Sequence, residues 1–124
     1  MAIINNSSRQ VFTLPRMKHQ TLASGADLLQ HLEVWMQTLD PGAATPTHYH
    51  ECEEVIVVLR GAGRLVVAGE TTEFGPGTTL VVSPKVIHQL INGGGEEMCL
   101  VVGMSETPAR VFAPDGSVMT LPWS

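Results

Sequence analysis

Charged residues are scarce in this sequence, and basic residues are the scarcer sign. Only 15% of the 124 residues are charged, and the formal net charge is -5. Long solvated helices and disordered segments usually carry more charge than this. Nucleic acids and anionic membrane surfaces attract basic patches, which an acidic chain of this kind does not supply. We therefore expect a folded domain whose main partner is neither a nucleic acid nor a membrane.

The sequence is also poor in cysteine and in long apolar runs. Its two cysteines are Cys52 and Cys99, and no apolar run approaches the roughly 20 residues that span a bilayer. The first residues, MAIINNSSRQVF, lack the basic flank and apolar core of a secretion signal. Two cysteines in such a chain are expected to be reduced thiols, and the expected location is the cytoplasm.

Short apolar, β-branched runs dominate what is present. They alternate with Gly- and Pro-containing turns, and no segment keeps a helical period over three turns, although a short helical turn before residue 28 is compatible with the pattern. Short strands at this spacing indicate an all-β sandwich or barrel. The expected strands are residues 28–39, 55–59, 64–69, 79–83, 88–91 and 98–104, with weaker candidates at 11–14 and 109–114.

The length fits one domain, residues 1–124, with a barrel core at about 28–104 and an arm at each end. Runs such as VIVVL (55–59) are apolar on both faces, which predicts that both faces are covered. The chain has few residues to spare for a second cover. A homodimer is therefore expected.

One polar stretch, HYHECEE at residues 48–54, carries the chemistry. His48 and His50 are two residues apart, so on an extended chain their side chains share a face. Glu54 lies four residues after His50, so on an extended chain its side chain is on the same face. Two readings follow from the residues alone: a metal site, or a polar loop tip that happens to hold two histidines.

The surrounding spacing resembles the first motif of the cupin superfamily. Gly42 is followed at the motif's intervals by His48, His50, Glu54 and Gly61. Residues 77–92, GTTLVVSPKVIHQLIN, resemble the second motif, with Gly77 opening it, His88 closing its loop and Asn92 four residues later. Ser83 and Lys85 stand where the family usually has Pro and Gly, which is expected to change the loop more than the ligand.

The resemblance implies a small double-stranded β-helix, a jelly-roll-like barrel that holds one divalent metal through His48, His50, Glu54 and His88. Three imidazoles and one carboxylate suit Fe, Mn, Ni, Co, Cu or Zn. Such a metal would leave positions open for water, O₂ or a ligand, and its residual positive charge would favour a small, anionic or oxygen-rich molecule. The alternative is a barrel that keeps these residues as a polar core without a metal.

Further candidates for the pocket lie on the strand expected at 28–39. His31, Glu33, Trp35 and Gln37 share one face of it, and this face either lines the mouth of the pocket or is the less buried side of a sheet. A polar side chain there is a candidate general acid or base. Cys52 lies between two ligands, where it either contacts the site or is a small, partly buried residue.

Two residues outside the motifs also carry expectations. His19, beside Arg16 and Lys18 in a stretch without a strand pattern, is expected to be exposed to solvent. Trp123, close to the C-terminus, is expected to dock against the domain or against a partner subunit.

Two functions are compatible with these residues. The first is a metal-dependent enzyme of the cupin type, whose reaction is an oxidation by O₂, a decarboxylation, an isomerisation or a lyase reaction on a small oxygen-rich metabolite. The metal would act as a Lewis acid. The alternative is a non-catalytic protein that binds or senses a small molecule with the help of the metal. Fold and ligands alone do not choose between them.

Overall fold

The apolar, β-branched runs form strands, as their β propensity predicts. The computed structural model describes residues 1–123, and in that range it has eleven strands, two 3-10 turns and no α-helix. The turns are η1 (Asn6–Ser8) and η2 (Gly25–Asp27). The strands are β1 (Val11–Leu14), β2 (Met17–Ala23), β3 (Glu33–Leu39), β4 (Glu54–Arg60), β5 (Gly63–Val67), β6 (Glu70–Phe74), β7 (Thr78–Val82), β8 (His88–Asn92), β9 (Met98–Met104), β10 (Val111–Phe112) and β11 (Val118–Met119).

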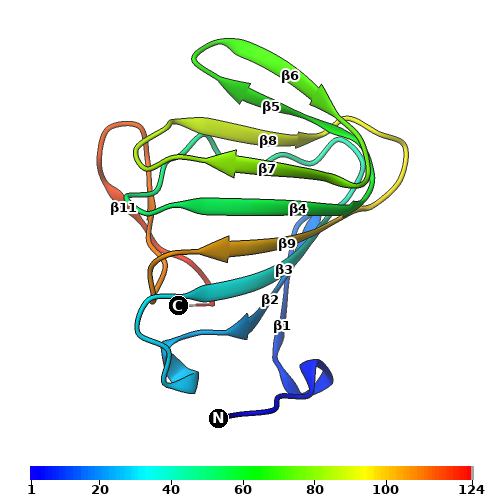
Figure 1. Ribbon diagram of the computed structural model, residues 1–124. Coiled ribbons are helices and arrows are strands. Elements are labelled where there is room, and N and C mark those ends of the chain that lie inside the picture. Colours follow the sequence, from blue (N-terminus) through cyan, green and yellow to red (C-terminus); the bar gives the residue numbers. More distant parts are fainter. Residues whose placement is uncertain (124) are drawn as a thin grey trace.

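The strands build two main antiparallel sheets and a short ribbon (Figure 1). The larger sheet has the order β1-β2-β3-β9-β4-β7, the smaller has the order β6-β5-β8, and β10 pairs with β11. Several neighbours, such as β3 with β9 and β5 with β8, are far apart in the sequence. The all-β architecture predicted from the sequence is confirmed.

The core lies on the inner face of the larger sheet. Along β3 and β9, buried and half-buried residues alternate over all seven positions. Leu39 and Met98 face each other across these strands and are almost completely buried, as is Leu100. Ile56 and Val58 of β4 point into the same core. Burial of this apolar face is the main stabilising contribution to the fold.

The fixed glycines of the two motifs make turns that other residues adopt only with strain. Gly42, Gly61 and Gly77 all have positive φ angles, of 78°, 95° and 75°. Gly63 has a different reason: a Cβ built there would lie 2.3 Å from the carbonyl oxygen of Ile91. These positions therefore keep glycine for conformation or for close approach of the backbone.

Several strand boundaries differ from the prediction. The strand expected at 28–39 begins only at Glu33, because η2 and a bend occupy the residues before it. The 3-10 turn η2 agrees with the short turn expected before residue 28. β2, β6 and β11 were not predicted, and the weak candidate at 109–114 shrinks to the two residues of β10. The sequences of β2 and β6, MKHQTLA and ETTEF, are too polar to resemble core strands.

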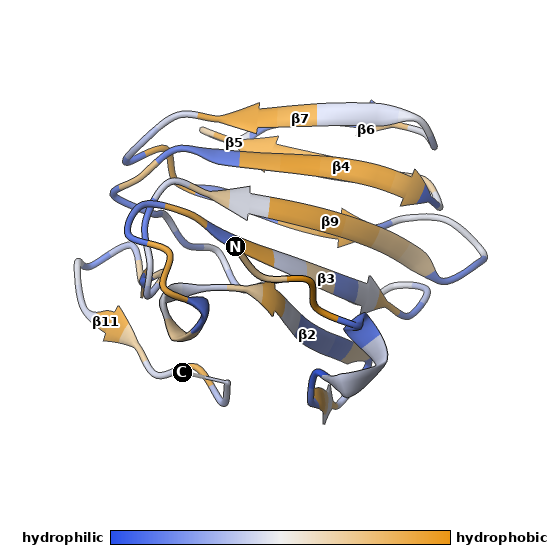
Figure 2. Cartoon of the chain, turned by 60° about the horizontal axis from the view of Figure 1, so that its bottom comes forward, coloured by the Kyte–Doolittle hydropathy of each residue, from blue (hydrophilic) through white to orange (hydrophobic). Residues whose placement is uncertain are grey.

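The outer face of the larger sheet is apolar. Figure 2 shows hydrophobic residues concentrated in β4, β7 and β9. Val55 of β4 is directly opposite Val81 of β7, and the two side chains are 39% and 75% exposed. Leu59, further along β4, is 54% exposed. The homodimer was expected because runs such as VIVVL are apolar on both faces. The structure shows that part of this outer face is exposed in the single chain.

Neither cysteine forms a disulfide: Cys52 and Cys99 are both free thiols, as expected from the sequence. Among the described residues, no helix has the length and apolar character required to cross a bilayer.

Candidate metal site

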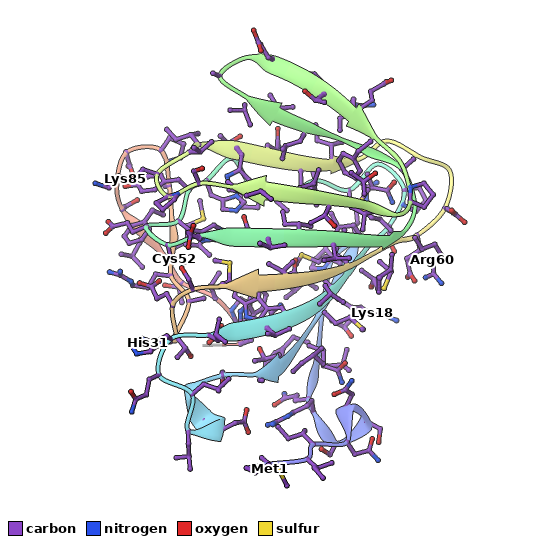
Figure 3. The ribbon with its side chains drawn as sticks, in the orientation of Figure 1. Met1, Lys18, His31, Cys52, Arg60 and Lys85 are labelled. Atoms are coloured by element: carbon purple, nitrogen blue, oxygen red, sulfur yellow. The ribbon has the colours of Figure 1, made fainter. Side chains whose placement is uncertain are left out.

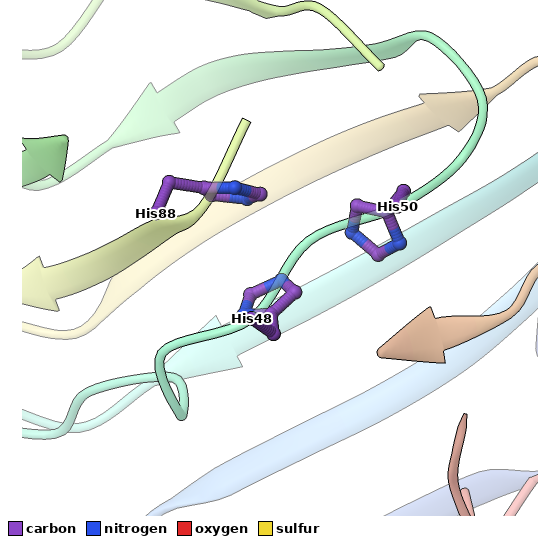
Figure 4. A group of neighbouring side chains, drawn as sticks. All are labelled: His48, His50 and His88. Carbon is purple, nitrogen blue, oxygen red and sulfur yellow. The ribbon is translucent and has the colours of Figure 1, made fainter. Parts of the chain in front are cut away.

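Backbone pairing brings the four candidate ligands together. The N–H of His48 donates to the carbonyl oxygen of His88 at 3.0 Å, and the N–H of His88 donates back to His48 at 2.8 Å. His50 follows His48 on the same side of the chain, and Glu54 begins β4. One ring nitrogen from each histidine lies within 4.8 Å of the others, and all three rings are buried (Figure 4). The predicted convergence of the imidazoles is thus observed.

Hydrogen bonds to the backbone fix the tautomer of all three rings. Nδ1 of His48 lies 2.6 Å from the carbonyl oxygen of Pro46, and Nδ1 of His88 lies 2.8 Å from that of Val86. Nδ1 of His50 lies 2.8 Å from the carbonyl oxygen of Arg110. A carbonyl oxygen only accepts, so each Nδ1 carries the proton. Each neutral ring therefore presents the Nε2 lone pair that a metal requires.

Glu54 places a carboxylate against these lone pairs. Its oxygens lie 3.5 Å from Nε2 of His50 and 3.1 Å from Nε2 of His88. Despite this proximity, Glu54 Oε1 and His50 Nε2 are buried atoms without a hydrogen-bond partner. Lone pairs that face one another in a buried site require a cation between them. The unpartnered atoms therefore show that this donor set fits a metal ion.

The pKa values show the same coupling. Burial lowers the pKa of His48 to about 4. Burial alone would lower the pKa of His50 and raise that of Glu54, but their mutual attraction outweighs it in both cases. The pKa of His50 is therefore raised, and that of Glu54 falls to about 2. The carboxylate of Glu54 and the imidazole of His50 thus each favour the charged form of the other.

The ligands open onto a predominantly apolar pocket of about 240 Å³. Apart from His48, His50, Glu54 and His88, no titratable side chain of the described residues lines it. The other polar side chains in the lining are Gln37, Thr45, Thr120, Trp35 and Trp123. The apolar wall is made by Leu14, Met17, Pro46, Ile56, Leu90, Leu100, Val102, Val111, Met119, Leu121 and Pro122. Such a pocket favours a ligand with an apolar body and one charged end.

Of the pocket residues proposed from β3, the structure brings two to the site. Trp35 and Gln37 line the metal pocket, on the inner face of the strand. The other interpretation took the face with Glu33, Trp35 and Gln37 for the less buried side of the sheet. It is wrong, because these three residues are buried and their neighbours on the opposite face of β3 are only half-buried. The strand turns this polar face inward because its amide, indole and carboxylate groups find partners there.

Glu33 and His31 do not reach the metal pocket. The buried carboxylate of Glu33 accepts hydrogen bonds from Trp35 Nε1 at 2.6 Å and from the hydroxyl of Thr107 at 3.0 Å. It lines a different hollow, between η2 and the loop that follows β9. His31 precedes β3 and is exposed (Figure 3). Neither is placed to act as an acid or base at the metal.

Cys52 is buried beside the site and does not line the pocket. It packs with the apolar core at the start of β4 (Figure 3), and burial raises the pKa of its thiol. The interpretation of Cys52 as a small buried residue therefore agrees with the structure. A thiol with a raised pKa is a poor nucleophile and a poor metal ligand.

The loop before His88 keeps the backbone shape that glycine favours. Lys85, where the family usually has glycine, adopts a φ of 68°, in the left-handed region. Its N–H donates to the carbonyl oxygen of His50 at 2.7 Å. The sequence predicted that lysine at this position would change the loop more than it would change His88. His88 does stay with the other candidate ligands, and the loop keeps a left-handed residue at the usual energetic cost for lysine.

Of two aromatic residues near the pocket, the sequence correctly predicted that Trp123 docks and wrongly predicted that His19 is exposed. Trp123 docks on its own domain and stacks on His19, with ring centroids 3.5 Å apart. His19 lies in β2 and is completely buried, so the expectation of an exposed histidine was wrong. The C-terminal residues 119–123 line the pocket as well. An apolar tail that ends in tryptophan was the signal available for this contact.

Comparison with known proteins agrees with this geometry. Residues 35–104 match the family model described as Cupin domain. Auxin-binding protein 1 of Arabidopsis thaliana is 37% identical over 109 residues, which are 79% of this chain and 54% of that protein. Auxin-binding protein T85 of Nicotiana tabacum is 37% identical over 112 residues, covering 80% and 59%. The chain thus spans little more than half the length of the curated relatives it matches.

Solved structures show the same fold at lower identity. The polyketide cyclase RemF from Streptomyces resistomycificus superimposes with a TM-score of 0.76 at 24% identity, over 98% of this chain and 88% of that one. The oxalate decarboxylase of Lactobacillus farciminis gives a TM-score of 0.77 at 16% identity, over 88% and 34%. The predicted cupin barrel is thereby confirmed.

Proposed function

This chain belongs to the cupin family, and on that premise we propose that it binds a small organic anion at a divalent transition metal. His48, His50, Glu54 and His88 would hold the metal. The observation that carries the proposal is the set of three Nδ1–H hydrogen bonds to carbonyl oxygens, which leaves three Nε2 lone pairs and one carboxylate converging in a buried pocket. This donor set suits Mn, Fe, Co, Ni, Cu and Zn.

The charge balance and the walls of the pocket define the ligand. When bound, the metal supplies positive charge and open coordination positions, and the single carboxylate of Glu54 leaves part of that charge unneutralised. An anionic oxygen on the ligand completes the balance. The apolar wall, with Trp35 and Trp123 in it, selects an apolar or aromatic body for the remainder of the molecule. Two relatives are named auxin-binding proteins, which supports binding of a small molecule. The class of aromatic carboxylates is proposed from the charge balance and the walls of the pocket.

Binding without turnover is supported better than catalysis. The two titratable candidates for general acid or base, His31 and Glu33, lie outside the pocket. Cys52 is also outside it, and its thiol stays protonated at neutral pH. Among residues 1–123, the pocket has no group placed to move a proton apart from the four candidate ligands, which favours a site that holds an anion. Enzymes among the structural neighbours share the fold only.

The proposal is tested by titrating the metal-loaded protein with indole-3-acetate and with indole-3-acetamide. The two molecules have the same aromatic body, and only the first carries a carboxylate. We expect saturable binding of the acid, at least tenfold weaker binding of the amide, and loss of acid binding when the metal is removed, all measured by isothermal titration calorimetry. Equal binding of the two compounds, or binding of the acid to metal-free protein, would contradict metal-assisted recognition of an anion.

Product analysis in the same samples separates the binding function from the catalytic one. Samples loaded with Fe(II) or Mn(II) are incubated in air with indole-3-acetate, catechols, keto acids and dicarboxylates, and the products are identified by mass spectrometry. Unchanged compounds alongside tight binding agree with the proposal. Catalytic turnover of any of them would assign the chain to the cupin enzymes instead.

We further propose that the chain is a homodimer, formed through the outer face of the larger sheet. The exposed row of Val55, Leu59 and Val81 supports this, because a second copy would remove these aliphatic side chains from water. We expect sedimentation equilibrium to give about twice the chain mass of 13.3 kDa. Val81→Lys should shift the protein to monomer, whereas Val118→Lys, at a valine 62% exposed on β11, should not. A dimer that survives Val81→Lys would place the interface elsewhere.

A further inference from the structure

His50 differs from the other two histidines in what holds its ring. The carbonyl oxygens that accept from His48 and His88 belong to Pro46 and Val86, each two residues earlier in the same segment. The acceptor for His50 is the carbonyl oxygen of Arg110, sixty positions away in sequence. The orientation of His50 therefore depends on a segment that the metal-binding motifs do not include.

That segment is fixed by a clamp between Glu106 and Arg110. One carboxylate oxygen of Glu106 accepts from the main-chain N–H of Arg110 at 3.0 Å. The other accepts from the Arg110 guanidinium, from Nε at 2.9 Å and also from Nη2. A single side chain thus binds both the backbone and the side chain of the residue whose carbonyl holds His50. Both side chains are partly exposed, so their ion pair is expected to contribute little to the stability of the whole domain and to act mainly on the segment around Arg110.

Two aromatic rings continue the support on the other side of Arg110. Phe112 and Tyr49 form a reciprocal pair of backbone hydrogen bonds, at 2.9 and 3.0 Å, and their rings stack with centroids 5.2 Å apart. The guanidinium carbon of Arg110 lies 5.2 Å from the centre of the Phe112 ring. Arg110 is therefore held from both directions, and its carbonyl oxygen accepts from His50, the residue that follows Tyr49.

We propose that Glu106 and Arg110 are a positioning pair that fixes the tautomer and orientation of His50 and thereby tunes the affinity of the metal site. This inference rests on the proposed metal-binding function. The physical reason is that a metal-binding imidazole needs its Nδ1–H held by an acceptor, because this bond fixes which nitrogen keeps its lone pair and where that lone pair points. No hydrogen bond joins Glu106 to His50, so Glu106 holds the ring in place through Arg110. Its negative charge also acts on the ring directly and contributes to the raised pKa of His50.

The test uses the full chain and has one arm without metal. In metal-free protein, ¹⁵N–¹H NMR of the histidine rings reports the tautomer of each ring. At a pH high enough to keep the three rings neutral, we expect wild type to show the Nδ1–H form at His48, His50 and His88. Glu106→Ala should leave the first and third unchanged and convert His50 to a mixture of tautomers with faster exchange of its ring N–H. This arm reports on the pair whether or not the protein binds a metal.

The second arm measures Co(II) and Zn(II) by competition with a chromophoric chelator and records the Co(II) absorption spectrum. We expect Glu106→Ala to weaken affinity about 10- to 100-fold, the usual effect of removing a partner of a metal ligand, and to shift the Co(II) bands. Glu106→Gln keeps an oxygen that can accept from the Arg110 N–H and should restore most of the affinity. The control is Glu97→Ala, which breaks the exposed ion pair of Glu97 with Arg60 and should change neither readout.

The outcomes are distinguishable. Metal affinity within twofold of wild type and an unchanged His50 tautomer in Glu106→Ala would overturn the proposed role, even if the melting temperature falls. A wild-type protein that binds neither metal would contradict the proposed function, and the NMR arm would still decide the role of the pair. If Glu106→Ala does not fold, Arg110→Ala provides the same comparison, because it removes the guanidinium and keeps the carbonyl.

Discussion

Replacing Glu54 with glutamine is expected to weaken metal binding about 100-fold or more and to leave the metal-free barrel as stable as wild type, or more stable. The carboxylate is buried, and one of its oxygens has no hydrogen-bond partner although Nε2 of His88 lies 3.1 Å away. A glutamine amide at this position can donate to an imidazole Nε2, and it removes a charge that is costly to bury. The same change takes away the only anionic ligand, so a divalent cation loses its strongest electrostatic partner.

Calorimetry with and without metal measures both parts of this result. At a metal concentration 100 times the dissociation constant, a bound metal stabilises the folded wild type by about 2.7 kcal/mol, which is a rise of about 10 °C in Tm for a chain of this size. At the same metal concentration, a 100-fold weaker site retains about 0.4 kcal/mol, or a rise of about 2 °C. The metal-dependent shift should therefore almost vanish in Glu54→Gln.

Glu33→Gln is the matched control for this experiment. Glu33 is another buried carboxylate of the same sheet, and it accepts hydrogen bonds from Trp35 and Thr107. Unlike Glu54, it does not itself line the metal pocket. Glu33→Gln should lower the stability of the metal-free protein, because one acceptor becomes a donor, and keep the full metal-dependent shift. Wild-type metal affinity in Glu54→Gln would show that the carboxylate is a structural group and not a ligand.

The convergence of the candidate ligands could be predicted from the sequence because its information is local. His48, His50 and Glu54 lie within seven residues, and their spacing fixes a common side of the chain. His88 lies in a second motif with its own turn glycine. What joins the two motifs is a pair of backbone hydrogen bonds between His48 and His88, which the barrel topology supplies. The fold class followed from the repeated short apolar runs for a similar reason.

The support around the ligands could not be predicted, because it comes from segments without a recognisable pattern. The carbonyl oxygen of Arg110 contacts His50 across sixty residues, and no side-chain type marks a carbonyl acceptor in a sequence. β2 was missed because its residues are mainly polar, so His19 was expected to be exposed. Its burial depends on Trp123, more than a hundred residues later, whose ring covers it. Local periodicity cannot predict such tertiary contacts.

That burial makes His19 the source of a second large effect: wild-type stability is expected to fall steeply in mild acid, and His19→Gln should flatten the dependence. Burial lowers the pKa of His19 to about 3, from 6.5 in an exposed histidine. Its ring stacks on Trp123, and its nitrogens lie 2.9 Å from Gln37 Nε2 and Thr21 Oγ1. None of these partners is charged, so nothing in contact with the ring stabilises an imidazolium.

The sign follows from which state takes up the proton first. Between pH 6.5 and pH 3 the unfolded chain has a protonated His19 and the folded chain a neutral one, so acid favours unfolding. The stability contribution is complete above about pH 6.5 and is lost progressively as the pH falls toward 3, by about 3 kcal/mol between pH 6.5 and pH 4. His48, with its pKa of about 4, acts in the same direction in metal-free protein. Only a comparison of variants isolates His19.

The measurement is urea unfolding at pH 7, 5.5 and 4 with a chelator present, followed by tryptophan fluorescence. His19→Gln loses the stacking of the imidazole on Trp123 and should be less stable than wild type at pH 7. Glutamine does not titrate, so the difference in unfolding free energy between the two proteins should shrink by about 3 kcal/mol at pH 4. His31→Gln, which removes an exposed histidine, should follow the wild-type curve. A difference between wild type and His19→Gln that stays constant across this range would mean that the ring is accessible to protons in the folded state. The stacked tail could not then be the closed wall of the metal pocket, because the same indole that covers His19 also lines that pocket.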